Sequence, residues 1–340
     1  MKNFIYIVLL FVFIACESDE NKKARFFFEG NNMIKEQYYP RAVEVYSQAI
    51  KIDPTFKDAY NNRGIAYFEL GEFDLALKDY NKAIALDPKF DKAYSNRANL
   101  FAKLNRWEEN LSDLEMIMAM KKDSIPILLD VGIANTQLKQ YSEALKYFDM
   151  VLQKEPENAK ALINRGTTKF YMDSLDQALQ DLSLAIKVDP DESSSYNSIG
   201  QVYLAQEKFH EALGEFDEAL EKLPNEPYYL NNKGYALLKL GDTKEAESLI
   251  NRSIQLDPYN AWAYRNKGLY YLETDNTESA IRVLERAKEI NDQVEKLHFY
   301  LGNAYLKKGD KKAACEAFKT SMDQGDTEAT ALYAEHCNTD

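Results

Sequence analysis

The sequence predicts an all-α fold of nine consecutive helical hairpins, because three residue types recur with a 34-residue period. Glycines recur at Gly30, Gly64, Gly132, Gly166, Gly200, Gly234, Gly268 and Gly302. Alanines recur at Ala42, Ala76, Ala144, Ala178, Ala212, Ala246, Ala280 and Ala314. Prolines recur at Pro54, Pro88, Pro156, Pro190, Pro224 and Pro258. Constant offsets between three residue types indicate that one structural unit repeats along the chain.

The N-terminal residues differ in character from the repeats. Lys2 is followed by twelve apolar residues, Phe4 to Ala15, which is the length of a signal-peptide core and too short to span a bilayer. Ala15 and Cys16 then precede a polar stretch. This arrangement resembles the lipobox of bacterial lipoproteins, although Phe13 stands where leucine is usual.

The lipobox resemblance implies a signal peptide over 1–15, lipidation of Cys16 with fatty acids such as palmitate, and a short linker over 16–22. Several acyl chains give stable attachment, because each buried CH₂ contributes about 0.8 kcal/mol. We therefore expect an exported protein anchored by lipid in the bacterial cell envelope, at the outer membrane, on its periplasmic or its outer side. An ordinary cleaved signal peptide and a short uncleaved anchor are the alternatives.

Each repeat position has a packing role when the repeats are counted from residue 23. Small residues at positions 8 and 20 allow two helices to approach closely. Aromatic residues at positions 4, 11 and 24 fill the space beside them. Asp-Pro pairs such as Asp53-Pro54 end the second helix, because the α region is disfavoured before proline. Gly71 and Gly241 supply the flexible residue after the first helix.

These positions resemble the tetratricopeptide repeat, which has glycine at position 8, alanine at 20 and proline at 32. The resemblance implies a right-handed α-solenoid superhelix over 23–328, with a short capping helix and tail over 329–340. Nine repeats follow one another without insertion: 23–56, 57–90, 91–124, 125–158, 159–192, 193–226, 227–260, 261–294 and 295–328.

The third repeat, 91–124, departs most from the pattern. Ala98 replaces the glycine, Asn110 the alanine and Lys122 the proline. The spacing is unchanged, so we interpret this segment as a divergent repeat and not as a domain boundary. Asn110 at the helix crossing predicts a looser or bent junction.

Two cysteines lie near the C-terminus, Cys315 on the second helix of the ninth repeat and Cys337 on the expected capping helix. An exported protein meets an oxidising compartment, and these two helices should pack together. We therefore predict a Cys315–Cys337 disulfide that holds the cap on the array. Two buried free thiols are the alternative, because the sequence does not show whether the Cα atoms lie within about 7 Å.

Composition and motifs argue against catalysis. A net charge of −13, from 42 basic and 55 acidic residues, disfavours binding to nucleic acid. The three histidines lack the spacing of a metalloprotease site, and no phosphate-binding glycine loop, nucleophile elbow or calcium loop occurs. We therefore predict that the protein is not an enzyme and has no cofactor, no metal site and no small-molecule substrate.

In tetratricopeptide proteins the first helix of each hairpin lines a concave groove, and two sets of candidates occupy its inward positions. Asparagine side chains can bind an extended peptide backbone, and position 6 carries Asn62, Asn96, Asn164, Asn232 and Asn266. Repeats seven and eight carry side chains of the types that dominate interfaces: Tyr228, Asn231, Tyr235, Trp262 and Arg265. The alternatives are that asparagine is merely the common residue at position 6, and that Trp262 covers a neighbouring helix.

The resulting functional hypothesis is a membrane-anchored scaffold that binds a protein or extended peptide in its groove, in envelope assembly, secretion or surface complexes. No repeat carries the lysine at position 5 that the family's carboxylate clamp uses, so we do not expect chaperone C-terminal tails as ligands. A structural spacer or oligomerising component without a groove ligand is the alternative.

Overall fold

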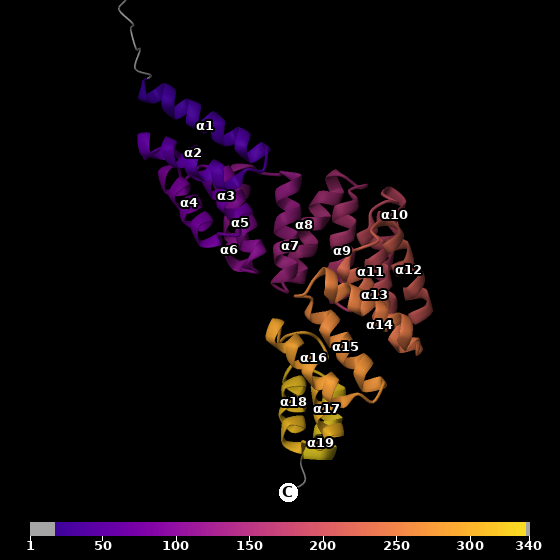
Figure 1. Cartoon of the computed structure of the whole chain (residues 1–340). Coiled ribbons are helices and arrows are strands. Elements are labelled where there is room, and N and C mark those ends of the chain that lie inside the picture. The colour runs from indigo at the N-terminus through magenta and orange to yellow at the C-terminus, as the bar shows by residue number, and fades with distance from the viewer. Residues whose placement is uncertain (1–17, 338–340) are drawn as a thin grey trace, which may run out of the picture. The chain divides into compact units, whose positions relative to one another are not determined.

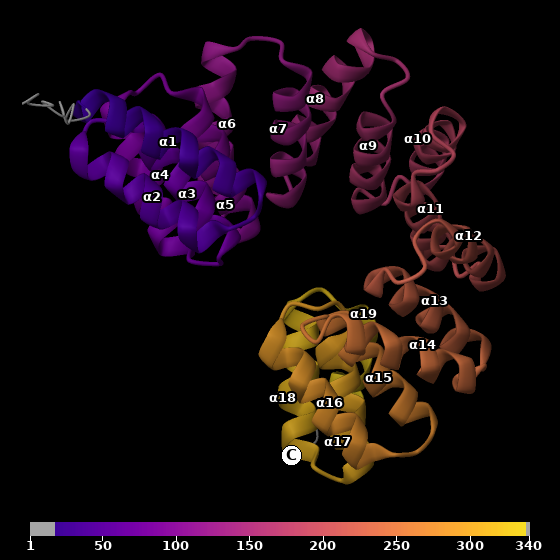
Figure 2. The same cartoon turned by 45° about the horizontal axis from the view of Figure 1, so that its top comes forward.

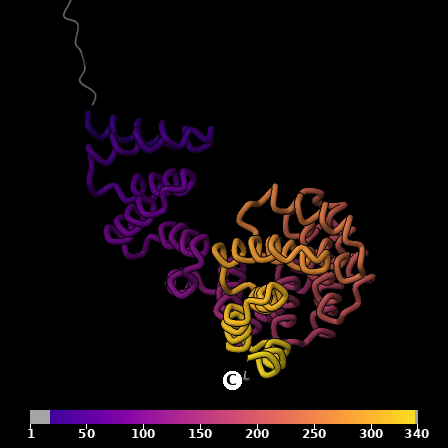
Figure 3. The backbone as a smooth tube through the Cα atoms, turned by 60° about the horizontal axis from the view of Figure 1, so that its bottom comes forward, coloured from indigo at the N-terminus to yellow at the C-terminus, as the bar shows by residue number. Residues whose placement is uncertain are grey.

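The computed structural model describes residues 18–337, so the predicted signal peptide and Cys16 lie outside the described residues. Residues 18–337 form nineteen helices joined by short turns and contain no strand. Figure 3 traces the backbone from helix to helix. The predicted all-α solenoid of nine hairpins with a C-terminal capping helix is confirmed. The right-handed sense of the superhelix stays a prediction.

The chain divides into two compact units, and the division falls between residues 147 and 148. Unit 1 contains α1 (Asp19–Lys35), α2 (Tyr39–Ile52), α3 (Lys57–Glu69), α4 (Phe73–Leu86), α5 (Asp91–Lys103), α6 (Trp107–Met120) and α7 (Ile125–Gln137). The division lies within α8 (Tyr141–Lys154), in the fourth repeat and not in the divergent third one.

Unit 2 contains the remaining helices. They are α9 (Ala159–Tyr171), α10 (Leu175–Val188), α11 (Ser193–Ala205), α12 (Phe209–Lys222), α13 (Pro227–Leu240), α14 (Thr243–Leu256), α15 (Ala261–Glu273), α16 (Thr277–Ile290), α17 (Leu297–Lys308), α18 (Lys311–Asp323) and α19 (Thr327–Cys337). Within each unit, odd-numbered helices pack against the even-numbered helices that follow them, as α3 and α4 do in Figure 1 and α13 and α14 in Figure 2. We call the first and second helix of each hairpin the A helix and the B helix.

In seven hairpins the glycine at position 8 of the A helix lies against the large residue at position 24 of the B helix. A Cβ atom added to Gly64 would lie 2.6 Å from the Tyr80 ring, and one added to Gly302 would lie 2.4 Å from the Phe318 ring. Tyr80 and Phe318 are almost completely buried. The predicted close approach of the two helices is therefore made by glycine against a buried ring.

The turn between the A and B helices uses left-handed backbone in almost every described repeat. Gly71 and Gly241 have φ values of 76° and 85°, as expected for glycine at the end of a helix. Other residue types adopt the same region at the equivalent turn: Gln37, Asn105, Lys139, Asp173, Glu207 and Asp275. The repeat geometry imposes this conformation even where no glycine is present.

The divergent third repeat keeps its hairpin, in which α5 packs against α6. Asn110 is 5% exposed, and its amide nitrogen donates to the Ala98 carbonyl oxygen at 2.8 Å. The Asn110 carbonyl oxygen has no partner among the residues described. One hydrogen bond thus accommodates the larger side chain at the helix crossing.

Helix α1 begins four residues earlier than the first repeat. Ser18 accepts a hydrogen bond from the Asn21 backbone N–H at 3.3 Å, so the serine caps the helix and Asp19 begins it. Residues 19–22, which we expected to belong to a linker, are therefore helical.

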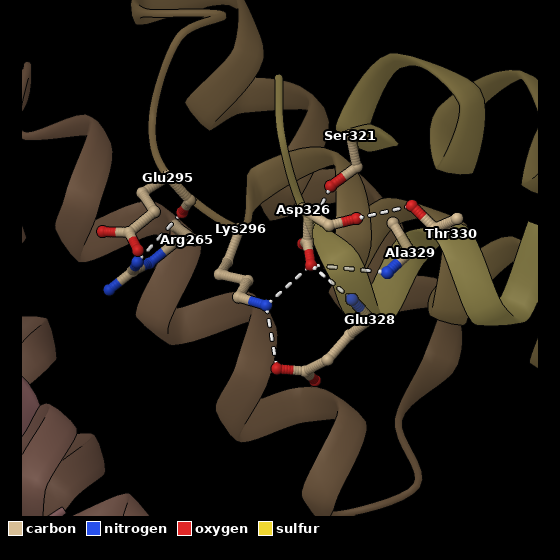
Figure 4. A network of polar contacts seen from close by, with 8 residues as sticks. All are labelled: Arg265, Glu295, Lys296, Ser321, Asp326, Glu328, Ala329 and Thr330. Atoms are coloured by element: carbon tan, nitrogen blue, oxygen red, sulfur yellow. Dashed lines mark hydrogen bonds and ion pairs between the residues drawn. The ribbon is translucent and has the colours of Figure 1, made fainter. Parts of the chain in front are cut away.

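The C-terminal helix α19 packs on α18 and buries Ala329 beside Phe318. Cys315 and Cys337 form a disulfide with their Cα atoms 5.7 Å apart, within the range that a disulfide requires. Asp326 precedes α19 and accepts hydrogen bonds from the Lys296 ammonium at 2.8 Å and the Ser321 hydroxyl at 3.0 Å (Figure 4). The cap is thus held by apolar packing, an ion pair and a covalent bond; disulfide formation in the cell stays a prediction.

Candidate functional site: an asparagine-lined groove

The asparagines of unit 1 form a continuous chain of hydrogen bonds across three A helices. The Asn96 amide on α5 donates to the Asn61 carbonyl oxygen at 2.9 Å, and Asn61 donates to Asn62 at 3.0 Å within α3. Asn62 then donates to Asn31 on α1 at 2.8 Å. The carboxamides therefore point along the stack of helices and connect one repeat to the next.

Tyr46 on α2 holds Asn31 in place at the α1 end of this chain of hydrogen bonds. Its hydroxyl donates to the Asn31 carbonyl oxygen at 2.7 Å. Burial raises the pKa of Tyr46 to about 12, so the phenol keeps its proton at neutral pH and remains a donor. The Asn31 oxygen accepts two hydrogen bonds, which leaves its amide nitrogen as the unused end.

Two cavities adjoin this chain and share Asn62 and Ile65. A cavity of about 340 Å³ lies over α1 and α3, and a cavity of about 400 Å³ lies over α3, α5 and the start of α7. The first is lined by Phe28, Asn31, Asn32, Ile34, Lys35, Tyr46, Asn62 and Ile65. The second is lined by Asn61, Asn62, Ile65, Asp91, Lys92, Ser95, Asn96, Ile117, Lys121, Ser124 and Ile127. We call these two adjoining cavities the unit-1 groove.

The unit-1 groove offers unused hydrogen-bonding groups beside apolar surface. The Asn31 amide nitrogen and the Asn96 carbonyl oxygen have no hydrogen-bond partner within residues 18–337. Phe28, at the α1 end, is 67% exposed. Near α5, the ion pair between Asp91 and Lys121 forms part of the groove wall. The groove can therefore donate a hydrogen bond, accept a hydrogen bond and bury an apolar side chain.

The asparagines of unit 2 also pair with one another, and two of them are buried. Asn266 donates to Asn231 at 2.8 Å, and Asn232 donates to Asn197 at 2.9 Å. Asn231 and Asn266 are only 2% and 1% exposed. Asn164 instead donates to the Lys160 carbonyl oxygen of its own helix. The prediction that the five asparagines at position 6 offer free amide donors to a peptide is therefore wrong, because four of them donate to another asparagine and Asn164 donates within its own helix.

Arg265 belongs to the same buried layer of unit 2. Its guanidinium donates to the side-chain oxygen of Asn266 at 2.7 and 3.0 Å. The same group donates to the Glu295 backbone carbonyl oxygen at 3.0 Å, as Figure 4 shows. It also lies over the Tyr235 ring, 5.2 Å from the centroid. Arg265 is 9% exposed, so the expectation that it contacts a ligand directly is wrong for this conformation. Its hydrogen bonds connect repeats eight and nine.

Tyr228 and Trp262 remain on the surface of unit 2. They are 44% and 41% exposed, and their rings meet edge to face with centroids 6.3 Å apart. The five residues predicted as one patch therefore separate into an exposed aromatic pair and a layer formed by buried Asn231 and Arg265 with half-buried Tyr235.

A recurring buried ion pair between the two helices of a hairpin was not predicted from the sequence. Arginine at position 7 contacts aspartate at position 23 through two nitrogens, and this occurs in three hairpins: Arg63–Asp79, Arg97–Asp113 and Arg165–Asp181. The third nitrogen donates to the preceding B helix, as Arg165 does to Asp149 at 2.6 Å. Both residue types follow the 34-residue period, so the same search could have found them.

No group of three His, Cys, Asp or Glu side chains suited to a metal ion occurs among residues 18–337. Over the same range, no helix has the length and apolar character needed to cross a membrane.

Family models match most of the described chain. Models described as tetratricopeptide repeat match residues 58–90, 163–227, 197–261, 231–295 and 296–323. A model described as TPR repeat matches 30–71, and one described as Fis1 C-terminal tetratricopeptide repeat matches 131–163.

Curated relatives match short segments. Hsp70-Hsp90 organizing protein 3 from Arabidopsis thaliana is 49% identical over 51 residues, which are 15% of this chain and 9% of that protein. The human small glutamine-rich tetratricopeptide repeat-containing protein beta is 47% identical over 51 residues, 15% of this chain and 17% of that protein. The chain thus covers less than a fifth of the length of either relative.

Solved structures share the fold at low identity. The APC/C hetero-tetramer Cut9-Hcn1 matches with a TM-score of 0.62 and 15% identity, over 96% of this chain and 78% of that chain. The human IFIT1 dimer matches with a TM-score of 0.57 and 19% identity, over 78% of this chain and 68% of that chain. Tetratricopeptide proteins are in general non-enzymatic scaffolds that mediate protein–protein interactions. Repeat models that together match more than half of its residues show that this chain belongs to the tetratricopeptide repeat family.

Proposed function

We propose that this protein is an envelope-tethered scaffold that holds an extended segment of a partner protein in the unit-1 groove. The observation that carries the proposal is the pair of unused amide groups on Asn31 and Asn96, at the two ends of an ordered asparagine chain. An extended peptide presents one N–H and one C=O per residue, which match a carboxamide acceptor and donor. The asparagine chain holds these groups in place before binding, which lowers the entropic cost of ordering them.

The apolar part of the groove indicates what side chains the bound segment carries. Phe28 and Ile34 line the cavity over α1, and Ile65 lines both cavities. Their burial by a ligand contributes about 25 cal/mol per Å² of apolar surface removed from water. We therefore propose a segment with at least one large apolar residue next to a stretch of exposed backbone.

The curated relatives named as Hsp70-Hsp90 organizing proteins support a protein partner for this fold. Their chaperone partners are not proposed for this chain. Phe27 stands at position 5 of the first repeat, where the carboxylate clamp of the family uses lysine. A groove without that ammonium lacks a main anchor for a C-terminal carboxylate.

Photo-crosslinking from the groove tests the proposal in cells. With p-benzoylphenylalanine in place of Phe28, we expect a discrete crosslinked partner, because this side chain lines the α1 cavity. The matched control is the same replacement at Tyr38, which is 61% exposed in the same unit and does not line the groove. If Phe28→Glu weakens binding of the crosslinked partner about tenfold or more, the groove is supported, since an apolar anchor contributes about 1–2 kcal/mol or more. Identical adducts from both positions, or none from position 28, would favour the spacer function.

Lipid attachment at Cys16 is a separate part of the proposal. It is supported by the lipobox-like sequence, which ends two residues before the Ser18 cap of α1. We expect Cys16→Ala to abolish labelling with radioactive palmitate and to release the protein from the membrane fraction. Cys315→Ala is the control, because it removes a cysteine that has no role in anchoring. Continued labelling of Cys16→Ala would contradict the lipoprotein assignment. The groove proposal is tested separately, by the crosslinking experiment.

A further inference from the structure

The exposed aromatic pair of unit 2 lies next to carboxylates that have no cation. Tyr228 lies in the first turn of α13, and Trp262 lies in the first turn of α15. Asp257 stands at position 31 of the seventh repeat, and the equivalent Asp87 contacts Lys57 at the start of its own A helix, so the Asp257 carboxylate belongs at the start of α13 beside Tyr228. Burial and then the negative charge of Asp257 raise the pKa of Tyr228, and Glu226 acts in the same direction. No Lys, Arg or His lies within ion-pair distance of Asp257 or Glu226 among residues 18–337, and no cation lies over the Tyr228 or Trp262 ring in that range.

Other repeats of this chain show how a cation can occupy such a place. Lys57, the first residue of the second repeat, forms an ion pair with Asp87 at position 31 and lies over the Phe90 ring, 4.7 Å from the centroid. An ammonium thus sits between a carboxylate and an aromatic face.

A similar arrangement occurs in the first repeat, at the same positions, and in the ninth repeat, where the lysine and the aspartate stand one position later, at 2 and 32. In the first repeat, Lys23 contacts Asp53 at 3.1 Å and lies 5.2 Å from the Phe56 centroid. In the ninth, Lys296 contacts Asp326 at 2.8 Å and lies 4.9 Å from the Phe299 centroid; Figure 4 shows its ammonium directed at Asp326.

The third repeat has the opposite polarity at the same two positions. Asp91 is its first residue and Lys121 its residue at position 31, and the two form an ion pair. The charges at positions 1 and 31 are therefore paired in the first three repeats, whichever residue carries the positive charge.

In the seventh repeat the carboxylate is kept and the ammonium is missing. Asp257 stands at position 31, but position 1 is Pro227, which has no charge and begins α13. The aromatic residue also stands elsewhere: Asn260 replaces the phenylalanine at position 34, and the aromatic surface comes from Tyr228 and Trp262 at position 2 of successive repeats. Arg265, the arginine of α15, does not supply the missing charge, because it donates to Asn266 and to the Glu295 carbonyl oxygen.

From this comparison we infer that Tyr228, Trp262 and Asp257 form a site for the cationic side chain of an arginine or lysine in a basic peptide segment. The partner's cation takes the place that Lys57 occupies in the second repeat. Tryptophan is the most favourable ring for such a contact, and a neighbouring carboxylate adds charge attraction. The net charge of −13 favours a basic partner and disfavours nucleic acid. The site lies wholly in unit 2 and is separate from the unit-1 groove.

The test uses the full chain and a small defined probe, the peptide acetyl-Gly-Arg-Gly-amide. We expect saturable upfield shifts of its arginine δ-methylene protons in NMR titrations, because a guanidinium stacked on an aromatic face places these protons in the ring current. The citrulline analogue, which has the same shape without the charge, should bind about tenfold more weakly, and Asp257→Asn and Trp262→Leu should each weaken binding about fivefold or more.

A gain-of-charge variant makes the test specific. Pro227→Lys restores the ammonium found at position 1 of the second repeat, and it should abolish arginine binding because the chain's own side chain then fills the site. Asp189→Asn is the matched control, since Asp189 stands at position 31 of the fifth repeat without an aromatic pair, and it should leave binding unchanged. Equal binding of the arginine and citrulline peptides, or unchanged shifts with Trp262→Leu, would overturn the inference. Crosslinking from Phe28 should be unaffected by Trp262→Leu, so the groove proposal and this one can fail separately.

Discussion

Gly200→Ala is expected to lower the free energy of unfolding by about 2 kcal/mol, a cost typical of overpacking in a closely packed core. Gly200 lies in α11 at position 8, and an added Cβ would come 2.5 Å from the Phe216 ring on α12. Phe216 is completely buried, so its ring has no free space into which it can move. One methyl group must therefore separate two helices or force the ring from its preferred rotamer.

Gly214→Ala provides the matched comparison within the same hairpin. Gly214 lies inside α12, is exposed, and has no atom within 4 Å of an added Cβ. Alanine should raise the free energy of unfolding there by about 0.5–1 kcal/mol, since glycine is unfavourable in a helix interior. Urea unfolding followed by circular dichroism measures both variants. A stabilising effect of Gly200→Ala would contradict the packing explanation of the 34-residue period.

The second large effect is expected at Asp181, where Asp181→Asn should lower the free energy of unfolding by about 3 kcal/mol. The Asp181 carboxylate is 5% exposed and accepts hydrogen bonds from Arg165 at 2.7 and 2.8 Å and from Lys169 at 2.7 Å. Asparagine keeps the shape but removes the negative charge. Arg165 and Lys169, whose side chains are only 22% and 17% exposed, then both lose a negatively charged partner.

Two further variants distinguish a buried ion pair from simple loss of a side chain. Glu221→Gln, on the exposed last turn of α12, should change stability by less than about 0.5 kcal/mol. Combining Asp181→Leu with Arg165→Met and Lys169→Met should recover much of the loss, because apolar residues of similar volume can replace a buried charge cluster. If Asp181→Asn alone unfolds at the same urea concentration as the unaltered chain, the recurring ion pair does not stabilise the hairpin.

The helices themselves could be predicted because their determinants are local. Gly30 and Tyr46, or Gly200 and Phe216, are 16 residues apart within one hairpin, so a single repeat contains both partners of the contact. The same holds for Arg63 and Asp79. A strict period then repeats these contacts along the array, and the hairpins follow from it.

The candidate sites depended on contacts between repeats. Asn266 has its partner 35 residues away at Asn231, and Arg265 has its partner 30 residues away at the Glu295 carbonyl. The sequence predicted that side chains at positions 5 and 6 face the groove. In unit 2, neighbouring repeats bind these side chains, whereas in unit 1 some of their hydrogen-bonding groups have no partner within the described residues. A pattern within one repeat does not specify which of these occurs.

By itself, the sequence determined the repeat unit, the helix boundaries to within a few residues and the places of Tyr228 and Trp262. The tertiary structure decided which polar groups remain available, because a carboxamide or guanidinium can turn toward whichever neighbour lies within hydrogen-bonding distance. It also related Asp257 to Asp53 and Asp87, and so revealed that repeat seven keeps the carboxylate without its lysine. The backbone follows from local packing, whereas the binding surface depends on which side chains the adjacent repeats have already paired.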